Sequence, residues 1–209
     1  MGLSAKGPSI VFIALALFAV APTARAPLSV VNPNDNRRPA GQLKNGTLEL
    51  HLVMGMARWY PESPTDPYVD LPVFAEEGGP PQIPAPLIRV RTGTTIVATV
   101  RNDLTDSTIY LRGLATRPAP GPDNIPIRPG ESRTIRFVAG APGTYSYGGS
   151  PGVWVRTGGG ERDEAGGALV IDPEGVVPAD RIFVLNIWGD PIDTTSYSNA
   201  LAINGKSWP

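Results

Sequence analysis

The stretch Leu87-Ile88-Arg89-Val90-Arg91-Thr92-Gly93-Thr94-Thr95-Ile96-Val97-Ala98-Thr99-Val100-Arg101 decides the fold class. Apolar and polar side chains alternate on both sides of Gly93, which is the pattern of two half-buried β-strands joined by a turn. An earlier stretch, Thr47 to Met54, alternates in the same way and places four apolar side chains on one face: Leu48, Leu50, Leu52 and Met54. These stretches predict an all-β protein.

The rest of the chain continues this pattern. Further strands are expected at residues 108–114, 133–138, 144–147 and 167–171, separated by segments rich in glycine and proline. Residues 60–86 contain many prolines and predict a long crossing loop. Short strands at this spacing, with no amphipathic helix between them, are typical of a sandwich or barrel.

The composition excludes several classes of function. The chain has 209 residues with 24 glycines and 24 prolines, which suits strands joined by frequent turns. Its net charge of -1 and pI near 5.8 offer no basic surface, so we expect no nucleic-acid partner. The absence of cysteine excludes disulfides, thiolate metal sites, a cysteine nucleophile and the thiolate that a blue-copper centre needs.

The amino terminus has the pattern of a secretory signal peptide. Lys6 precedes an apolar run from Ile10 to Val20, and Ala24-Arg25-Ala26 follows in the small-x-small pattern of a cleavage site. We therefore expect residues 1–26 to be a signal peptide and residues 27–46 to be an irregular lead-in. The protein is expected to be exported to the periplasm or the extracellular space, with no membrane contact after cleavage.

A change of character follows residue 173. Residues 174–180 read as a linker, and Arg181 to Trp188 is apolar on both faces, as a new buried strand would be. Asn204-Gly205 predicts a hairpin turn. We expect residues 181–209 to be the incomplete start of a second domain, and a chain ending near Pro173 to be the more soluble monomer.

Several short blocks resemble, in order and spacing, the first cupredoxin domain of the multicopper oxidases. They are Pro84–Thr94, Val97–Leu104, Ile109–Leu114, Ile127–Ser132, Ala141–Tyr147 and Gly166–Ile171. The resemblance covers roughly Leu48 to Asp172 and implies a cupredoxin-like Greek-key β-sandwich over residues 47–173. Residues 181–209 resemble the first strands of a second cupredoxin domain.

The resemblance also implies where copper would be held. In that family two His-x-His pairs of the first domain help to hold a three-copper cluster that reduces dioxygen to water. The corresponding positions here are Tyr110, Arg112, Gly148 and Ser150. The fixed positive charge of Arg112 opposes a cation, and the Tyr110 phenol loses its proton only at a cost. We therefore expect no metal-binding, cofactor-binding or catalytic residue in this chain.

Other candidate residues have simpler interpretations. His51 is the only histidine and lies on the strand face opposite the leucines, so we expect it to face solvent or a partner. Asn45-Gly46-Thr47 fits a glycosylation acceptor, although Asn-Gly also predicts a turn. The Gly158–Gly160 run is expected to be a flexible loop, and the tryptophans Trp59, Trp154, Trp188 and Trp208 are expected to be packing residues.

Three functional hypotheses remain open. The first is the amino-terminal fragment of a secreted oxidase-like protein, whose copper sites lie in missing downstream domains and whose partners are those later cupredoxin domains. The second is a copper-free, exported structural or binding protein of the SufI type, which also resembles the multicopper oxidases. The third is a generic β-sandwich adhesion module, against which the ordered family blocks count. In each case we expect this chain alone not to be catalytic.

Overall fold

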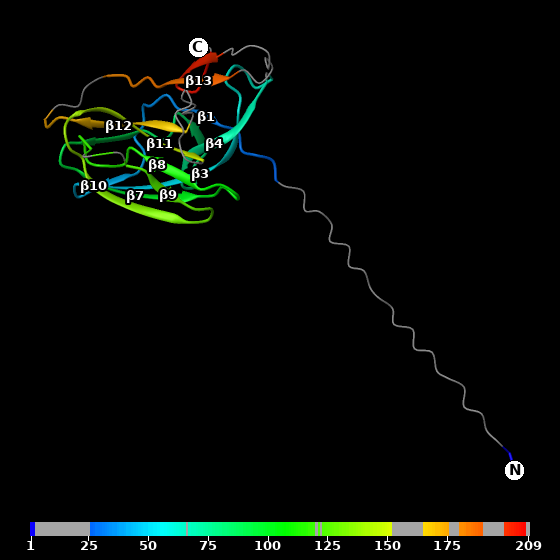
Figure 1. Cartoon of the computed structure of the whole chain (residues 1–209). Helices are drawn as coiled ribbons and strands as arrows, with labels where there is room; N and C mark the ends of the chain where they lie inside the picture. The colour runs from blue at the N-terminus through cyan, green and yellow to red at the C-terminus, as the bar shows by residue number, and fades with distance from the viewer. Residues whose placement is uncertain are drawn as a thin grey trace.

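The structure is a computed structural model that describes residues 1–2, 26–65, 67–119, 121, 123–151, 165–175, 180–189 and 199–207. Within these residues every regular element is a β-strand. Two sheets form the body of the molecule, and a small third sheet lies beside them (Figure 1). The prediction of an all-β sandwich is confirmed. Almost all of the predicted signal peptide lies outside the described residues.

The larger sheet has seven strands in the order β1, β5, β4, β3, β7, β10, with β2 paired to β3 off this path. Its strands are β1 (Asn32–Pro33), β2 (Gln42–Lys44), β3 (Thr47–Trp59), β4 (Val69–Glu76), β5 (Pro81–Ile83), β7 (Thr95–Asn102) and β10 (Ser132–Val138). Strand β3 runs antiparallel to β4 and parallel to β7. It is the long central strand on which the sheet is built.

The second sheet has five strands in the order β6, β12, β11, β8, β9. Its strands are β6 (Ile88–Arg91), β8 (Ile109–Arg112), β9 (Ile125–Ile127), β11 (Gly143–Pro151) and β12 (Gly166–Asp172). Strands β6 and β12 are parallel, while the neighbours of β11 on both sides are antiparallel to it. This arrangement places β8 directly beside β11.

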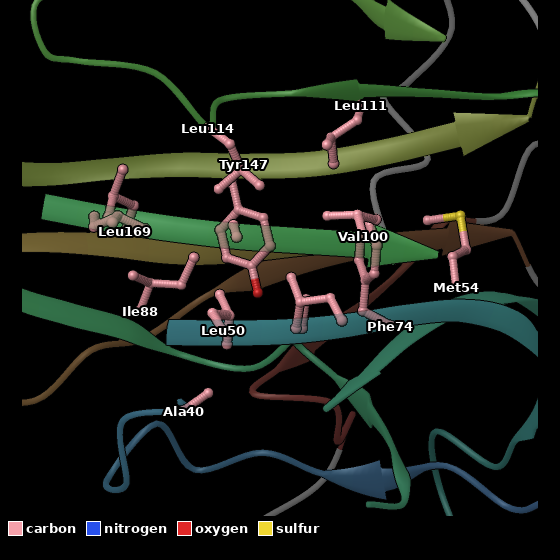
Figure 2. Close-up of a cluster of buried hydrophobic side chains, with 14 of the residues drawn as sticks. Ala40, Leu50, Met54, Phe74, Ile88, Val100, Leu111, Leu114, Tyr147 and Leu169 are labelled. Atoms are coloured by element: carbon pink, nitrogen blue, oxygen red, sulfur yellow. The ribbon is translucent and has the colours of Figure 1, made fainter. Parts of the chain in front are cut away.

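The core lies between the two sheets and is made by the alternating apolar residues that the sequence shows. Leu50 comes from the larger sheet, and Leu111 and Leu169 come from the smaller one; all three are fully buried. Figure 2 shows their side chains in one cluster around the ring of Tyr147. The centroids of the Phe74 and Tyr147 rings are 6.1 Å apart, and the two rings are tilted relative to each other, as aromatic pairs favour.

Three predicted irregular segments contain strands. The prediction of one long loop over residues 60–86 is wrong, because this segment includes β4 and β5. Pro72 lies on a part of β4 that has a partner strand on one side only, where proline is tolerated. Strand β9 was not predicted. The lead-in also contributes β1 and β2, and it buries Val31 and Ala40.

The described carboxy-terminal residues form the third sheet, which pairs β13 (Leu185–Gly189) with β14 (Asn199–Ile203). One side of this segment packs on the sandwich. Ala202 is buried in a cluster with Trp59 and Ile83, and Ile182 is buried beside Leu87. The residues expected to start a second domain therefore contact the two main sheets at these positions.

Polar contacts also hold this segment in place. The Trp59 indole Nε1 donates to the Gly205 carbonyl at 2.9 Å, and the Ser207 backbone N–H donates to the Pro61 carbonyl. Arg89 on β6 forms two hydrogen bonds with Asp172 and one with Asp180, each 2.8 or 2.9 Å long. Because Arg89 and Asp172 are both largely buried, this ion pair fixes the path of the chain after β12.

The carboxy-terminal segment explains why the outer face of β3 is exposed at the start of the strand and buried at its end. Glu49 and His51 on the outer face of β3 are exposed, whereas Ala57 and Trp59 on the same face are buried. The difference arises because the cluster that contains Ala202 covers only the end of the strand. The predicted outward position of His51 and packing role of Trp59 are both seen in the structure.

The other side of the third sheet is apolar and exposed. Leu185 lies opposite Ile203 in the β13 and β14 register, and Leu201 is the next residue on that face of β14. Together with Phe183 they form what we call the outer apolar face, and each is more than half exposed. Exposed apolar patches of this kind are typical of interaction surfaces.

Candidate functional site

Strands β8 and β11 bring all four candidate copper positions together. In their antiparallel register Arg112 lies opposite Gly148, and Tyr110 lies opposite Ser150. All four residues are half-buried and alternate with the fully buried residues Leu111 and Gly149. The four positions therefore share the outer face of the smaller sheet, on the side away from the core. We call this set the β8/β11 site.

The buried residues between them set the spacing of the two strands. A Cβ on Gly149 would lie 3.0 Å from the Met54 side chain and 3.2 Å from the Phe74 ring, so glycine lets β11 approach the larger sheet closely. The hydroxyl of the neighbouring core residue Tyr147 donates to the Pro86 carbonyl. Burial raises the pKa of this hydroxyl, which therefore remains a neutral donor.

The chain enters β8 from a loop that Asn102 holds in place. This asparagine is fully buried at the end of β7. Its Nδ2 donates to the carbonyls of Ser107 at 2.8 Å and Ile127 at 2.9 Å, and its Oδ1 accepts from the Leu104 N–H at 2.9 Å. One side chain thus connects β7, the loop before β8, and β9.

The chain leaves β8 through Gly113, which the fold requires to be glycine. Its φ of 83° lies in the left-handed region, and a Cβ there would be 2.3 Å from the Ser146 carbonyl oxygen. Its N–H donates to Asp123 at 2.7 Å. This close approach holds the end of β8 against β11, and so it fixes the β8/β11 site.

We expect Gly113→Ala to destabilise the protein far more than the matched variant Gly93→Ala. Gly93 has a φ of 82° but has nothing within 4 Å of the added Cβ. The left-handed conformation costs each variant about 1 kcal/mol, and the steric clash adds roughly 1–3 kcal/mol at Gly113 alone. Urea unfolding of both variants would measure this difference. Equal losses would show that the close approach at Gly113 is not tight.

The chemistry of the β8/β11 site differs from that of a copper site. Its side chains offer a guanidinium, a phenol and an aliphatic hydroxyl, while Gly148 offers none. The hydroxyl of Ser150 is buried and has no hydrogen-bond partner among the described residues. In the same part of the chain, no group of three or more His, Cys, Asp or Glu side chains is placed to hold a metal ion.

Gly148 also has little room for a larger side chain. A Cβ at this position would lie 3.3 Å from the Gly166 Cα and 3.4 Å from the Ala165 carbonyl oxygen. Gly166 is the direct partner of Gly148 on β12, so the row from Arg112 across these two glycines carries only one side chain. Even a Cβ at Gly148 would therefore need its neighbours at the start of β12 to shift by a few tenths of an ångström.

The remaining candidates do not contribute to this site. His51 is on the other sheet, where its Nδ1 lies 3.9 Å from Glu77, and Glu77 in turn binds Arg101 at 2.9 Å. This exposed group of charges is a solvated surface network. Asn45-Gly46 forms the predicted turn between β2 and β3. Trp154, Trp208 and the Gly158–Gly160 run lie outside the described residues.

Comparison with known proteins identifies relatives of the chain. Residues 80–175, which include the whole β8/β11 site, match the family described as multicopper oxidase. The chain is 31% identical over 147 residues to the "Probable nitrite reductase-hydroxylamine oxidoreductase fusion protein" of Kuenenia stuttgartiensis. This match covers 64% of this chain and 16% of that protein.

Solved structures with the same fold include copper enzymes. The copper nitrite reductase from Nitrosomonas europaea superposes with a TM-score of 0.57 at 20% identity, over 77% of this chain and 57% of that chain. The multicopper oxidase mgLAC superposes with a TM-score of 0.52 at 25% identity, over 76% of this chain and 53% of that chain. The chain thus spans a small part of the matched fusion protein and just over half of these two structures.

In the described residues, no helix is long and apolar enough to cross a membrane.

Proposed function

Because this chain contains a cupredoxin domain of the multicopper oxidase family, we propose that it is a copper-free structural module of a larger exported, oxidase-like protein. One observation carries the proposal. Strands β8 and β11 bring the four family ligand positions together on one face, and none of the four is an imidazole. We infer that this site has the strand arrangement of a copper site without side chains that could bind copper.

The residues at the β8/β11 site do not fit copper. Neutral imidazole is the nitrogen ligand that suits copper, and this chain has a single histidine, on the other sheet. Arg112 brings a permanent positive charge to the position of a ligand, which repels a cation. Gly148 supplies no donor atom, and the Ser150 hydroxyl is a weak copper ligand. The domain therefore contributes no copper ligand of its own.

The partners that we propose are later cupredoxin domains of the same larger protein. The chain spans only part of the proteins it matches, which are named as a probable nitrite reductase fusion protein, a copper nitrite reductase and a multicopper oxidase. The outer apolar face of β13 and β14 supports this proposal, because such a face is suited to packing against another sheet. The larger protein would then be a copper-dependent oxidoreductase that uses dioxygen, with its copper held elsewhere.

The amino-terminal sequence supports export of this protein. Its basic start, short apolar run and small-x-small motif are typical of a cleaved signal peptide. The lack of cysteine is neutral on this point, since a sandwich of this size can fold without disulfides. We accordingly propose that the domain acts in the periplasm or outside the cell.

Copper analysis tests the central proposal. We expect the chain from Pro27 onward to retain no stoichiometric copper after dialysis against Cu(II), and to oxidise neither phenols nor diamines. A positive control is available from the register, because Tyr110 and Ser150 lie directly opposite each other. We expect the double variant Tyr110→His, Ser150→His to gain Cu(II) binding, since cross-strand partners have Cβ atoms about 5 Å apart.

Two results would contradict the proposal. One is tightly held copper in the natural sequence that is lost in Tyr110→Phe, because this would make the phenol a ligand. The other is stoichiometric copper retention by the natural sequence at the level that the double-histidine variant reaches. A matched variant, Thr99→His with Thr134→His, places the same pair of histidines across β7 and β10, where the two threonine hydroxyls now lie 2.9 Å apart. It shows how much copper any cross-strand histidine pair would bind.

A further inference from the structure

The chain contains the dipeptide Asn-Gly twice, and the structure places both copies in the same type of turn. Asn45 and Gly46 have φ values of 49° and 73°, and Asn204 and Gly205 have values of 50° and 81°. Both are two-residue turns between paired residues, closed by Lys44 with Thr47 and by Ile203 with Lys206. The two turns therefore share one backbone conformation. Any difference in chemical reactivity between the Asn45 and Asn204 side chains must come from their surroundings.

The first turn is open. Asn45 and Gly46 are both exposed, and a Cβ added to Gly46 would have no atom within 4 Å. The Asn45 side chain makes no hydrogen bond within the described part of the chain. The turn is held only through its backbone, where the Thr95 N–H donates to the Gly46 carbonyl. The Asn45 amide is thus free to rotate toward the Gly46 nitrogen.

The second turn is locked. Asn204 Oδ1 accepts from the Asn36 side chain at 3.1 Å and from the Val184 N–H at 2.9 Å, and its Nδ2 donates to the Ile182 carbonyl at 3.1 Å. Gly205 is buried, and a Cβ there would lie 2.1 Å from the Ile83 carbonyl oxygen. Neither the side chain nor the backbone of this turn can move without breaking these contacts.

From this contrast we infer that Asn45 is a site of spontaneous deamidation and that the fold protects Asn204 from the same reaction. The backbone nitrogen of Gly46 attacks Cγ of Asn45 and forms a new N–Cγ bond. The bond from Cγ to Nδ2 breaks, and the side-chain nitrogen leaves as ammonia with the proton that the Gly46 nitrogen gives up. Water then opens the resulting five-membered imide and yields aspartate or isoaspartate, with no change of oxidation state.

The glycine at the following position favours this reaction, because no Cβ blocks the approach of the nitrogen to Cγ. The products change the tip of the hairpin between β2 and β3. Either product replaces a neutral amide with a carboxylate next to Lys44. Isoaspartate also adds a carbon to the backbone, and so it cannot form the same two-residue turn. The modified protein therefore carries a lasting chemical and structural mark at this one position.

The test is peptide mapping of the full chain after several weeks at mildly alkaline pH and 37 °C. We expect the mass increase of deamidation at residue 45 and little at residue 204. The expected ratio of rates is roughly tenfold or more, because residue 204 must first break its hydrogen bonds. Equal rates at the two positions, or no reaction at residue 45, would overturn the inference.

Two variants separate the local chemistry from the effect of the fold. Gly46→Ala adds a Cβ beside the attacking nitrogen and is expected to slow the reaction at residue 45 several-fold. Asn36→Ala removes one partner of the Asn204 side chain and is expected to speed the reaction at residue 204 while leaving residue 45 unchanged. If Asn36→Ala instead changes both rates equally, the protection is not local and the inference fails.

Discussion

Gly205→Ala is expected to detach the carboxy-terminal segment from the sandwich. The added Cβ would lie 2.1 Å from the Ile83 carbonyl oxygen and 3.2 Å from the Pro33 Cα, and backbone atoms cannot swing aside as a flexible side chain can. Its docked position also provides the carbonyl that accepts from Trp59. Relief of the clash therefore breaks this hydrogen bond and exposes the cluster around Trp59.

The expected loss is about 3–5 kcal/mol, from the strained φ, the overpacked backbone and the uncovered apolar side chains. The matched control is Gly46→Ala, which has a similar φ of 73° and no atom within 4 Å of the new Cβ. We expect this control to lose only about 1 kcal/mol. Urea unfolding followed by tryptophan fluorescence measures both. Equal losses would show that the docking of Gly205 contributes nothing to stability.

Removal of residues 174–209 extends the same argument. The sequence alone led us to expect that such a chain would be the better-behaved monomer, whereas the contacts in the structure favour the opposite result. Trp59, Ile83 and Leu87 are each almost fully buried, and part of their cover is the carboxy-terminal segment. We expect the shortened chain to associate or to unfold at a lower urea concentration. A stable monomer on size-exclusion chromatography would restore the boundary near residue 173.

Asn102→Leu is expected to destabilise the body of the sandwich strongly. It keeps the approximate volume of the side chain but removes the partners of the Leu104 N–H, the Ser107 carbonyl and the Ile127 carbonyl. A buried polar group without a partner costs about 1–3 kcal/mol, so we expect a total loss of roughly 3–5 kcal/mol. The loop before β8 should also become susceptible to proteolysis.

The variant Asn102→Asp gives the same test a pH dependence. An ionised carboxylate can accept from the Leu104 N–H, but it cannot donate to the two carbonyls, and its burial is unfavourable. The pKa of the introduced carboxyl would therefore be raised above its unfolded value near ~4, so its protonated form is favoured in the fold. The penalty is largest at neutral pH and shrinks as the pH falls through the raised value. The exposed control Asn45→Asp should change stability by less than about 0.5 kcal/mol.

Either asparagine result can be contradicted. If Asn102→Leu and Asn102→Asp unfold at the same urea concentration as the natural sequence, the three hydrogen bonds make no net contribution to the free energy of unfolding. If the penalty of Asn102→Asp does not change with pH, burial of the charge is not its cause. Equal losses for Asn102→Asp and Asn45→Asp would show that any asparagine of this chain responds in the same way.

The sequence predicts best those strands that have one buried face along their whole length. Strand β7 is such a case, since Ile96, Ala98 and Val100 are fully buried and the residues between them are not. Strand β4 was missed although Val69, Leu71 and Val73 alternate with Asp70 and Pro72, because the many prolines of residues 60–86 favoured a loop. Its Pro72 is tolerated because this part of β4 has a partner strand on one side only. That position in the sheet cannot be read from the local sequence.

The β8/β11 site was predictable in part. The two-residue spacing places Tyr110 beside Arg112, and Gly148 beside Ser150, on single strand faces. Their meeting across the two strands came from the family resemblance, because no local pattern links β8 to a strand that begins thirty residues later. The roles of Gly113 and Asn102 depend on backbone atoms of other strands, so residue type alone could not reveal them.

The docking of Gly205 under Trp59 also has a consequence for the order of events during biosynthesis. Trp59 is translated early, but the residues that complete its surroundings are translated after all the strands of the sandwich. A chain still growing on the ribosome therefore leaves this indole and its neighbours partly uncovered until β14 has emerged. Because β14 follows every strand of the two main sheets in the chain, this cluster is completed only after those sheets have been synthesised.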